Sequence, residues 1–81
     1  MHTELGLQME EAIIGKGSPI IGKTLVSSNL RQDFGVIIVA IKRITGEMVF
    51  NPGPSEVFNA NDVIVDIGKK AELRRMSKVV Y

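Results

Sequence analysis

Few residues of this chain carry groups suited to catalysis. The single histidine, His2, lies in a polar N-terminal leader, which argues against a catalytic or metal-binding role, and cysteine is absent. The serines have no histidine or other base at a suggestive spacing: Ser18, Ser27, Ser28, Ser55 and Ser77. Nucleophilic catalysis requires such a base beside the nucleophile. We therefore expect a protein that is not an enzyme.

The carboxylates argue against a metal site. Asp62 and Asp66 are four residues apart, which in a strand places them on one face about 13 Å apart, too far to share an ion. We expect Asp62 to accept hydrogen bonds from the backbone of its turn and Asp66 to face solvent or a lysine. Glu10 and Glu11 are interpreted as a solvated strand edge rather than as calcium ligands. No metal site is predicted.

The composition also limits the partners. Lys and Arg total 10 against 9 Asp and Glu, so the net charge of +1 offers little attraction to a polyanion. With one Tyr, three Phe and no Trp, few rings are present on which bases could stack, and we expect no nucleic-acid partner. The glycines in residues 15–22 match neither the Rossmann nor the Walker spacing, so loop geometry explains them better than phosphate binding.

The apolar pattern predicts the elements that position these residues. Expected strands are residues 7–14, 36–44, 48–50 and 63–67. The second of them is apolar at both alternating positions, which predicts a central strand covered on both faces. Thr45-Gly46 predicts a hairpin turn before the third strand.

Two helices complete the expected fold. A short helix begins after Ser28 or Asn29 and ends at Gly35, with Leu30 and Phe34 on one buried face. Beyond Gly68 the apolar residues keep helical spacing among basic ones, which predicts an amphipathic C-terminal helix. The 81 residues therefore predict one α+β domain, a small mixed β-sheet with these two helices.

Several motifs resemble a known family. Residues 17–25 (GSPIIGKTL) and 30–43 (LRQDFGVIIVAIKR), followed by Asn51-Pro52 and residues 61–68 (NDVIVDIG), are similar to the TrkA C-terminal domain, also called the C-terminal lobe of the RCK domain. Residues 1–9 are then a leader with the start of the first strand, and residues 10–81 the TrkA-C-like regulatory domain. Asn61 stands where the family usually has Gly, and asparagine tolerates the left-handed conformation that this turn requires.

The resemblance implies a regulatory domain on the cytoplasmic side of the membrane. Such a domain forms a homodimer, or a higher assembly in a gating ring, and controls potassium transport through an attached or associated channel. In some relatives cyclic di-AMP binds between the copies, and in others nucleotides or divalent cations bind elsewhere; no firm cofactor is implied. The alternatives are a purely structural dimerisation module and a regulatory domain of a cation/proton antiporter or anion transporter.

The resemblance also implies site residues. Arg31 stands where an arginine approaches the ligand phosphates in cyclic di-AMP binders, and a guanidinium fork suits that contact. The alternative is a surface arginine paired with Asp33 or a carbonyl. Val36, Ile37 and Ile38 form the expected apolar wall against a base. Phe34, Val36 and Ile38 are the expected dimer contacts. The asparagine that some binders place on this strand is absent, which counts against cyclic di-AMP.

Overall fold

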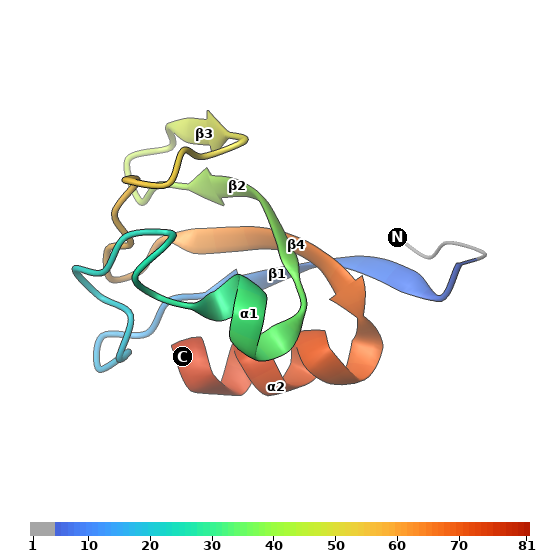
Figure 1. Ribbon diagram of the computed structural model, residues 1–81. Helices are drawn as coiled ribbons and strands as arrows, with labels where there is room; N and C mark the ends of the chain where they lie inside the picture. Colours follow the sequence, from blue (N-terminus) through green and yellow to red (C-terminus); the bar gives the residue numbers. More distant parts are fainter. Residues whose placement is uncertain (1–4) are drawn as a thin grey trace.

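The computed structural model describes residues 5–81, so His2 lies outside the described residues. These residues form four strands and two helices (Figure 1): β1 (Leu7–Ile13), α1 (Leu30–Phe34), β2 (Ile37–Lys42), β3 (Met48–Phe50), β4 (Val63–Lys69) and α2 (Lys70–Val80). All expected elements are present in the expected order. Within this part of the chain, neither helix has the length and apolar character that a bilayer crossing requires.

The strands form one sheet in the order β1-β4-β2-β3. All pairings between the described strands are antiparallel, so the α+β class is confirmed while the expected mixed sheet is corrected. β1 and β2 do run in the same direction, but β4 lies between them and no parallel pair forms. β2 and β4 are the inner strands, and the predicted central strand is indeed internal.

The core lies between the sheet and α2, which packs against β1 and β4 (Figure 1). Leu73, Met76 and Val80 keep the three- and four-residue spacing of one helix face, and each is at most 3% exposed. The amphipathic C-terminal helix is thereby confirmed. α1 adds Leu30 and Phe34 to the same core, as their four-residue spacing predicted.

The sheet is covered on one side only. The pairing of β2 with β4 shifts register between Ile38 and Ala40, so that Ile38 and Ile41 both lie in the core at 8% and 0% exposure. On the opposite face, Ile37 is 59% exposed. The prediction that this strand is covered on both faces is therefore wrong for the single chain, because both helices lie on the same side (Figure 1).

Close backbone contacts fix the ends of the helices. Gly35 adopts φ 64° after α1 and donates its N–H to the Arg31 carbonyl at 2.8 Å, as predicted for the helix end. At the end of α2, the Gly15 N–H donates to the Val80 carbonyl at 3.0 Å. A Cβ atom on Gly15 would lie 1.6 Å from the Tyr81 carbonyl oxygen, so only glycine permits this approach.

Candidate functional site

A groove of about 620 Å³ opens between α1, the start of β2 and two loops. One wall comes from the segment before and within α1, with Leu25, Val26, Asn29, Arg31 and Gln32. The other wall comes from β2 and the loop after β3, with Ile37, Ile38, Asn51, Pro52 and Pro54. Apolar side chains dominate this lining, and a few polar groups converge on it, which is the usual character of a small-molecule site.

The first wall is held by a compact turn. The Thr24 N–H donates to Ser27 Oγ at 2.8 Å, and the Ser27 N–H donates back to Thr24 Oγ1 at 3.0 Å. The Ser28 N–H then donates to the Thr24 carbonyl at 2.9 Å. These reciprocal bonds place Leu25 and Val26 at the groove, although their spacing alone gives no sign of it.

The two walls are joined by backbone hydrogen bonds. The Leu25 N–H donates to the Glu56 carbonyl at 2.9 Å, and the Val26 N–H donates to the Pro54 carbonyl at 3.2 Å. Asn51 has φ 51°, a left-handed conformation that asparagine adopts more readily than other non-glycine residues. The loop after β3 is thus turned back onto the segment before α1, and the groove has a fixed outline.

Arg43 fastens the same loop to the sheet. Its guanidinium donates to the Val57 carbonyl and to Asp62 Oδ2, both at 2.7 Å, and to Glu56 Oε2 at 2.5 Å. Burial lowers the pKa of Arg43, but the hydrogen bonds to Asp62 and Glu56 outweigh it and raise the pKa above its ordinary value. Asp62 also accepts from the Ile44 and Asn59 N–H groups at 3.1 and 3.3 Å, which confirms its predicted role in the turn.

Arg31 lies exposed on α1 at the edge of the groove. Among the described residues its guanidinium forms no hydrogen bond or ion pair. Asp33, the alternative partner weighed from the sequence, instead accepts from Asn29 Nδ2 at 2.8 Å. The predicted arginine therefore has a free guanidinium, which is available to an anionic ligand.

The expected apolar wall is present only in part. Ile37 and Ile38 line the groove, whereas Val36 is 0% exposed and lies in the core. The expected dimer contacts Phe34, Val36 and Ile38 are all at most 8% exposed. All three belong to the hydrophobic core of the chain itself, so they offer little surface to a partner. Val36 is thereby corrected as a ligand contact.

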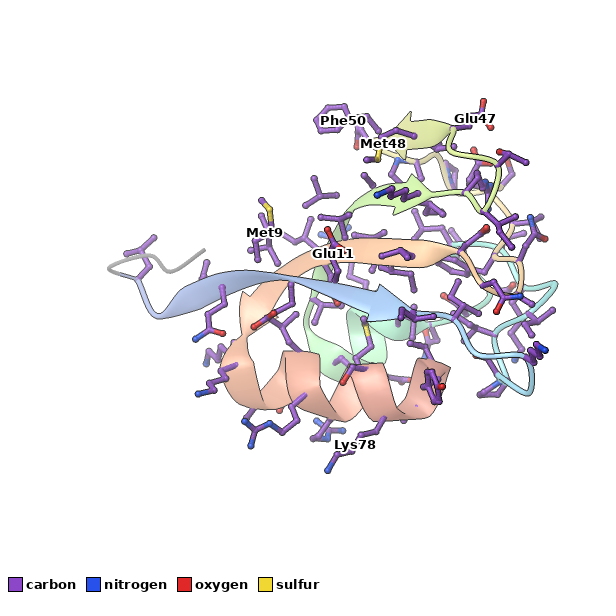
Figure 2. All side chains as sticks on the ribbon, turned by 180° about the vertical axis from the view of Figure 1, so that it is seen from behind. Met9, Glu11, Glu47, Met48, Phe50 and Lys78 are labelled. Atoms are coloured by element: carbon purple, nitrogen blue, oxygen red, sulfur yellow. The ribbon has the colours of Figure 1, made fainter. Side chains whose placement is uncertain are left out.

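Exposed and partly exposed apolar side chains gather instead on the sheet face opposite α2, which we call the open face. It comprises Met9 and Ile13 of β1, Val63, Val65 and Ile67 of β4, Ile37 of β2, and Met48 and Phe50 of β3. Figure 2 shows Met9, Met48 and Phe50 on this side of the sheet. Phe50 is 74% exposed, and Ile37 belongs to both the open face and the groove. Such a surface is typical of a contact between chains.

The prediction for Asp66 is wrong. Its side chain is 1% exposed, and neither carboxylate oxygen has a hydrogen-bond partner. Alternation along β4 places Asp66 on the same side as Ile64, toward the core, rather than toward solvent. Glu10 is exposed, as predicted for a strand edge, and it pairs with Asp66 across β1 and β4. Within residues 5–81, no three candidate ligands are placed to hold a metal ion.

Comparison with known sequences identifies the family. The sequence pattern of the TrkA-C domain matches residues 9–80. This chain belongs to the TrkA-C domain family. The resemblance seen in residues 17–25 and 30–43 is thereby confirmed, and Asn61, which replaces the usual glycine, has the expected left-handed conformation with φ 67°.

Two curated relatives of this TrkA-C domain come from Bacillus subtilis strain 168. It is 32% identical over 63 residues to the K(+)/H(+) antiporter subunit KhtT, covering 78% of this chain and 38% of that protein. It is 32% identical over 79 residues to the Ktr system potassium uptake protein C, covering 98% of this chain and 35% of that protein. The TrkA-C domain thus spans well under half the length of either relative.

Solved TrkA-C structures include two complexes with cyclic di-AMP. The RCK-C domain dimer of S. agalactiae BusR with c-di-AMP matches at TM-score 0.82 and 29% identity, covering 93% of this chain and 91% of that one. The RCK C domain of the potassium transport protein KtrA with c-di-AMP matches at TM-score 0.79 and 25% identity, covering 89% and 81%. BusR with its busAB-promotor DNA matches at TM-score 0.83 and 28% identity, covering 99% of this chain and 38% of that chain.

Proposed function

We propose that this TrkA-C domain is a regulatory, non-enzymatic domain that binds cyclic di-AMP in the groove, between two copies of itself. Through this binding it controls potassium transport by a membrane protein to which it is attached or bound, on the cytoplasmic side of the membrane. The observation that carries the proposal is the free Arg31 guanidinium at the edge of a largely apolar groove. The ligand class follows from the solved relatives that are complexes with cyclic di-AMP.

The groove suits one half of a cyclic dinucleotide. Such a ligand has two phosphates and two adenines related by twofold symmetry, which fits a twofold dimer that offers one arginine from each copy. Arg31 supplies a planar fork to a phosphate, and Ile37 with Pro54 supplies apolar surface to a base. Asn51 adds an amide to the same groove.

The open face supplies the contact with the second copy. Ile37 belongs to this face and to the groove, so a copy docked there borders the ligand as well. Ligand that bridges both copies stabilises one dimer arrangement over another, and only such a difference in affinity can bias an attached pore. Phe34 and Val36, buried in the core, are not part of this contact.

Calorimetric titration with cyclic di-AMP tests the proposal. Wild-type domain is expected to bind one ligand per dimer. Arg31→Met should weaken binding by about tenfold to a hundredfold, the range for loss of a charge-assisted hydrogen bond. Arg31→Lys keeps the positive charge and loses the planar guanidinium fork. The matched control is Lys78→Met, which removes an exposed cation of α2 and should bind cyclic di-AMP as the wild type does. Absence of binding by the wild type, or equal binding by Arg31→Met, would refute the site.

The rival function is a structural dimer that holds subunits together and binds no regulatory ligand. A dimer whose melting temperature does not respond to cyclic di-AMP, nucleotides or divalent cations would establish it. The class of transport is a separate question, since one relative is a potassium uptake protein and another an antiporter subunit. The remainder of the polypeptide or operon that carries this domain decides it: a pore segment with a potassium selectivity sequence indicates a channel.

A further inference from the structure

A second feature lies under α2, away from the groove. Asp66 projects from β4 into a cavity of about 210 Å³, which Glu10, Lys70, Arg74 and Ser77 also line. Asp66 is 1% exposed, and both of its carboxylate oxygens lack a hydrogen-bond partner. Buried polar groups are nearly always paired, and an orphaned carboxylate calls for a specific explanation.

The charges around this carboxylate are of both signs. β1 contributes Glu10, which pairs directly with Asp66, and its neighbour Glu11. α2 contributes Lys70 and Arg74. From β2, the residue paired with Asp66 is the apolar Ile38. The two cations line the cavity, but neither forms an ion pair with Asp66.

This arrangement fits the neutral form of the carboxyl group. Burial is the largest cause that raises the pKa of Asp66 from its ordinary value of 3.8 to about 7; the Asp66 backbone N–H opposes the rise, and the negative charge of Glu10 adds to it. An ionised carboxylate in this place needs a donor or water. Lys70, Arg74 and Ser77 are the side-chain donors of α2 that line the cavity, and none of them bonds to Asp66 in the observed arrangement, so they must move to reach it.

We propose that Asp66 and the cavity around it form a proton-responsive element that sets how closely α2 packs against β1 and β4. With Asp66 neutral, α2 lies as observed. Loss of the proton draws Lys70 or Arg74 inward, or admits water, and loosens the first turns of α2. Because Arg75 of α2 lies 5.0 Å from the ring centre of Phe34 in α1, the change is transmitted toward the helix that carries Arg31. This last step alone depends on the proposed function of the groove.

The sign of the effect on stability follows from linkage. A carboxyl group whose pKa is higher in the folded state than in the unfolded state stabilises the fold most at low pH, where it is protonated in both states. The unfolding equilibrium constant then rises about tenfold per pH unit between the ordinary value of 3.8 and about 7, and this contribution is flat above it. Asp66→Asn has no proton to lose, so it should lack this component of the pH profile.

Two measurements without ligand test the element. The first follows the Asp66 carboxyl carbon of the wild type by NMR, with an expected titration midpoint near neutrality. Glu10→Gln should lower that midpoint, and Glu47→Gln, an exposed change in the β2–β3 turn (Figure 2), should leave it unchanged. A wild-type midpoint below about pH 5, the range of ordinary carboxyl groups, would overturn the proposal.

The second measurement is hydrogen exchange of the α2 amides, corrected for the intrinsic effect of pH on exchange. Protection in the wild type should fall as pH rises from the ordinary value of 3.8 to about 7 and level off above it, and Asp66→Asn should remove this fall while retaining the folded state. Equal pH dependence in wild type and Asp66→Asn would also overturn the proposal. Neither experiment uses cyclic di-AMP. A negative result would therefore refute the proton-responsive element without refuting ligand binding in the groove, and failure of ligand binding would leave the element untouched.

Discussion

The Arg43 cluster offers a quantitative test of how the groove is held. Arg43→Met keeps the aliphatic stem and removes the guanidinium that contacts Asp62, Glu56 and the Val57 carbonyl. The Arg43 side chain is 12% exposed and that of Asp62 is 1% exposed, so the substitution leaves a buried carboxylate without its cation. Two backbone donors, the Ile44 and Asn59 N–H groups, remain on Asp62.

The expected loss is about 3 kcal/mol of unfolding free energy, at the lower end of the range for breaking one partner of a buried ion pair. The lower end applies because the backbone donors still compensate Asp62 and because Glu56, 33% exposed, can turn to water. Arg75→Met is the matched control. Arg75 pairs with Glu72 on the surface of α2 with its side chain 57% exposed, and its loss should cost less than about 1 kcal/mol.

Urea unfolding followed by circular dichroism measures both variants, and an unchanged slope would show that two-state unfolding is retained. The double variant Arg43→Met with Asp62→Asn should be more stable than Arg43→Met alone, because the uncompensated charge is gone. Equal losses in Arg43→Met and Arg75→Met would refute the assignment of Arg43 as the structural link between the loop and the sheet.

Three further outcomes follow from single positions. Gly15→Ala should lower the melting temperature sharply in a thermal scan, because its Cβ would overlap the Tyr81 carbonyl; a stability equal to wild type would contradict that contact. Asn61→Gly should raise the unfolding free energy by up to about 1 kcal/mol, since glycine adopts φ 67° without strain, and urea unfolding can detect a change of the opposite sign. Phe50→Asp, at a side chain 74% exposed, should leave the circular dichroism spectrum intact and convert the proposed dimer to monomer in analytical ultracentrifugation. A variant that remains dimeric would exclude the open face as the contact between copies.

Local sequence patterns were sufficient to predict the elements. Helical spacing of Leu73 and Met76 identified α2, and the pair Leu30 and Phe34 with Gly35 identified α1, because short-range side-chain periodicity reports which face is buried. Turn chemistry, in which aspartate bonds to the backbone near it, placed Asp62 in its turn. The family followed from motifs in sequence order, and through it Arg31 was predicted as a ligand contact before its position at the groove was known.

The remaining features depend on contacts between residues distant in sequence. Leu25 and Val26 reach the groove because their N–H groups bond to residues about thirty positions away, which periodicity cannot reveal. The burial of Asp66 depends on which face of the sheet α2 covers. Side chains alternate between the two faces of β4 in the same way whichever face the helix covers, so the sequence of the strand does not reveal it. The sequence by itself therefore determined the elements and the family. Only the tertiary structure decided that one face of the sheet is open and that a carboxylate is enclosed on the other, because these outcomes arise from the packing of helices on one side.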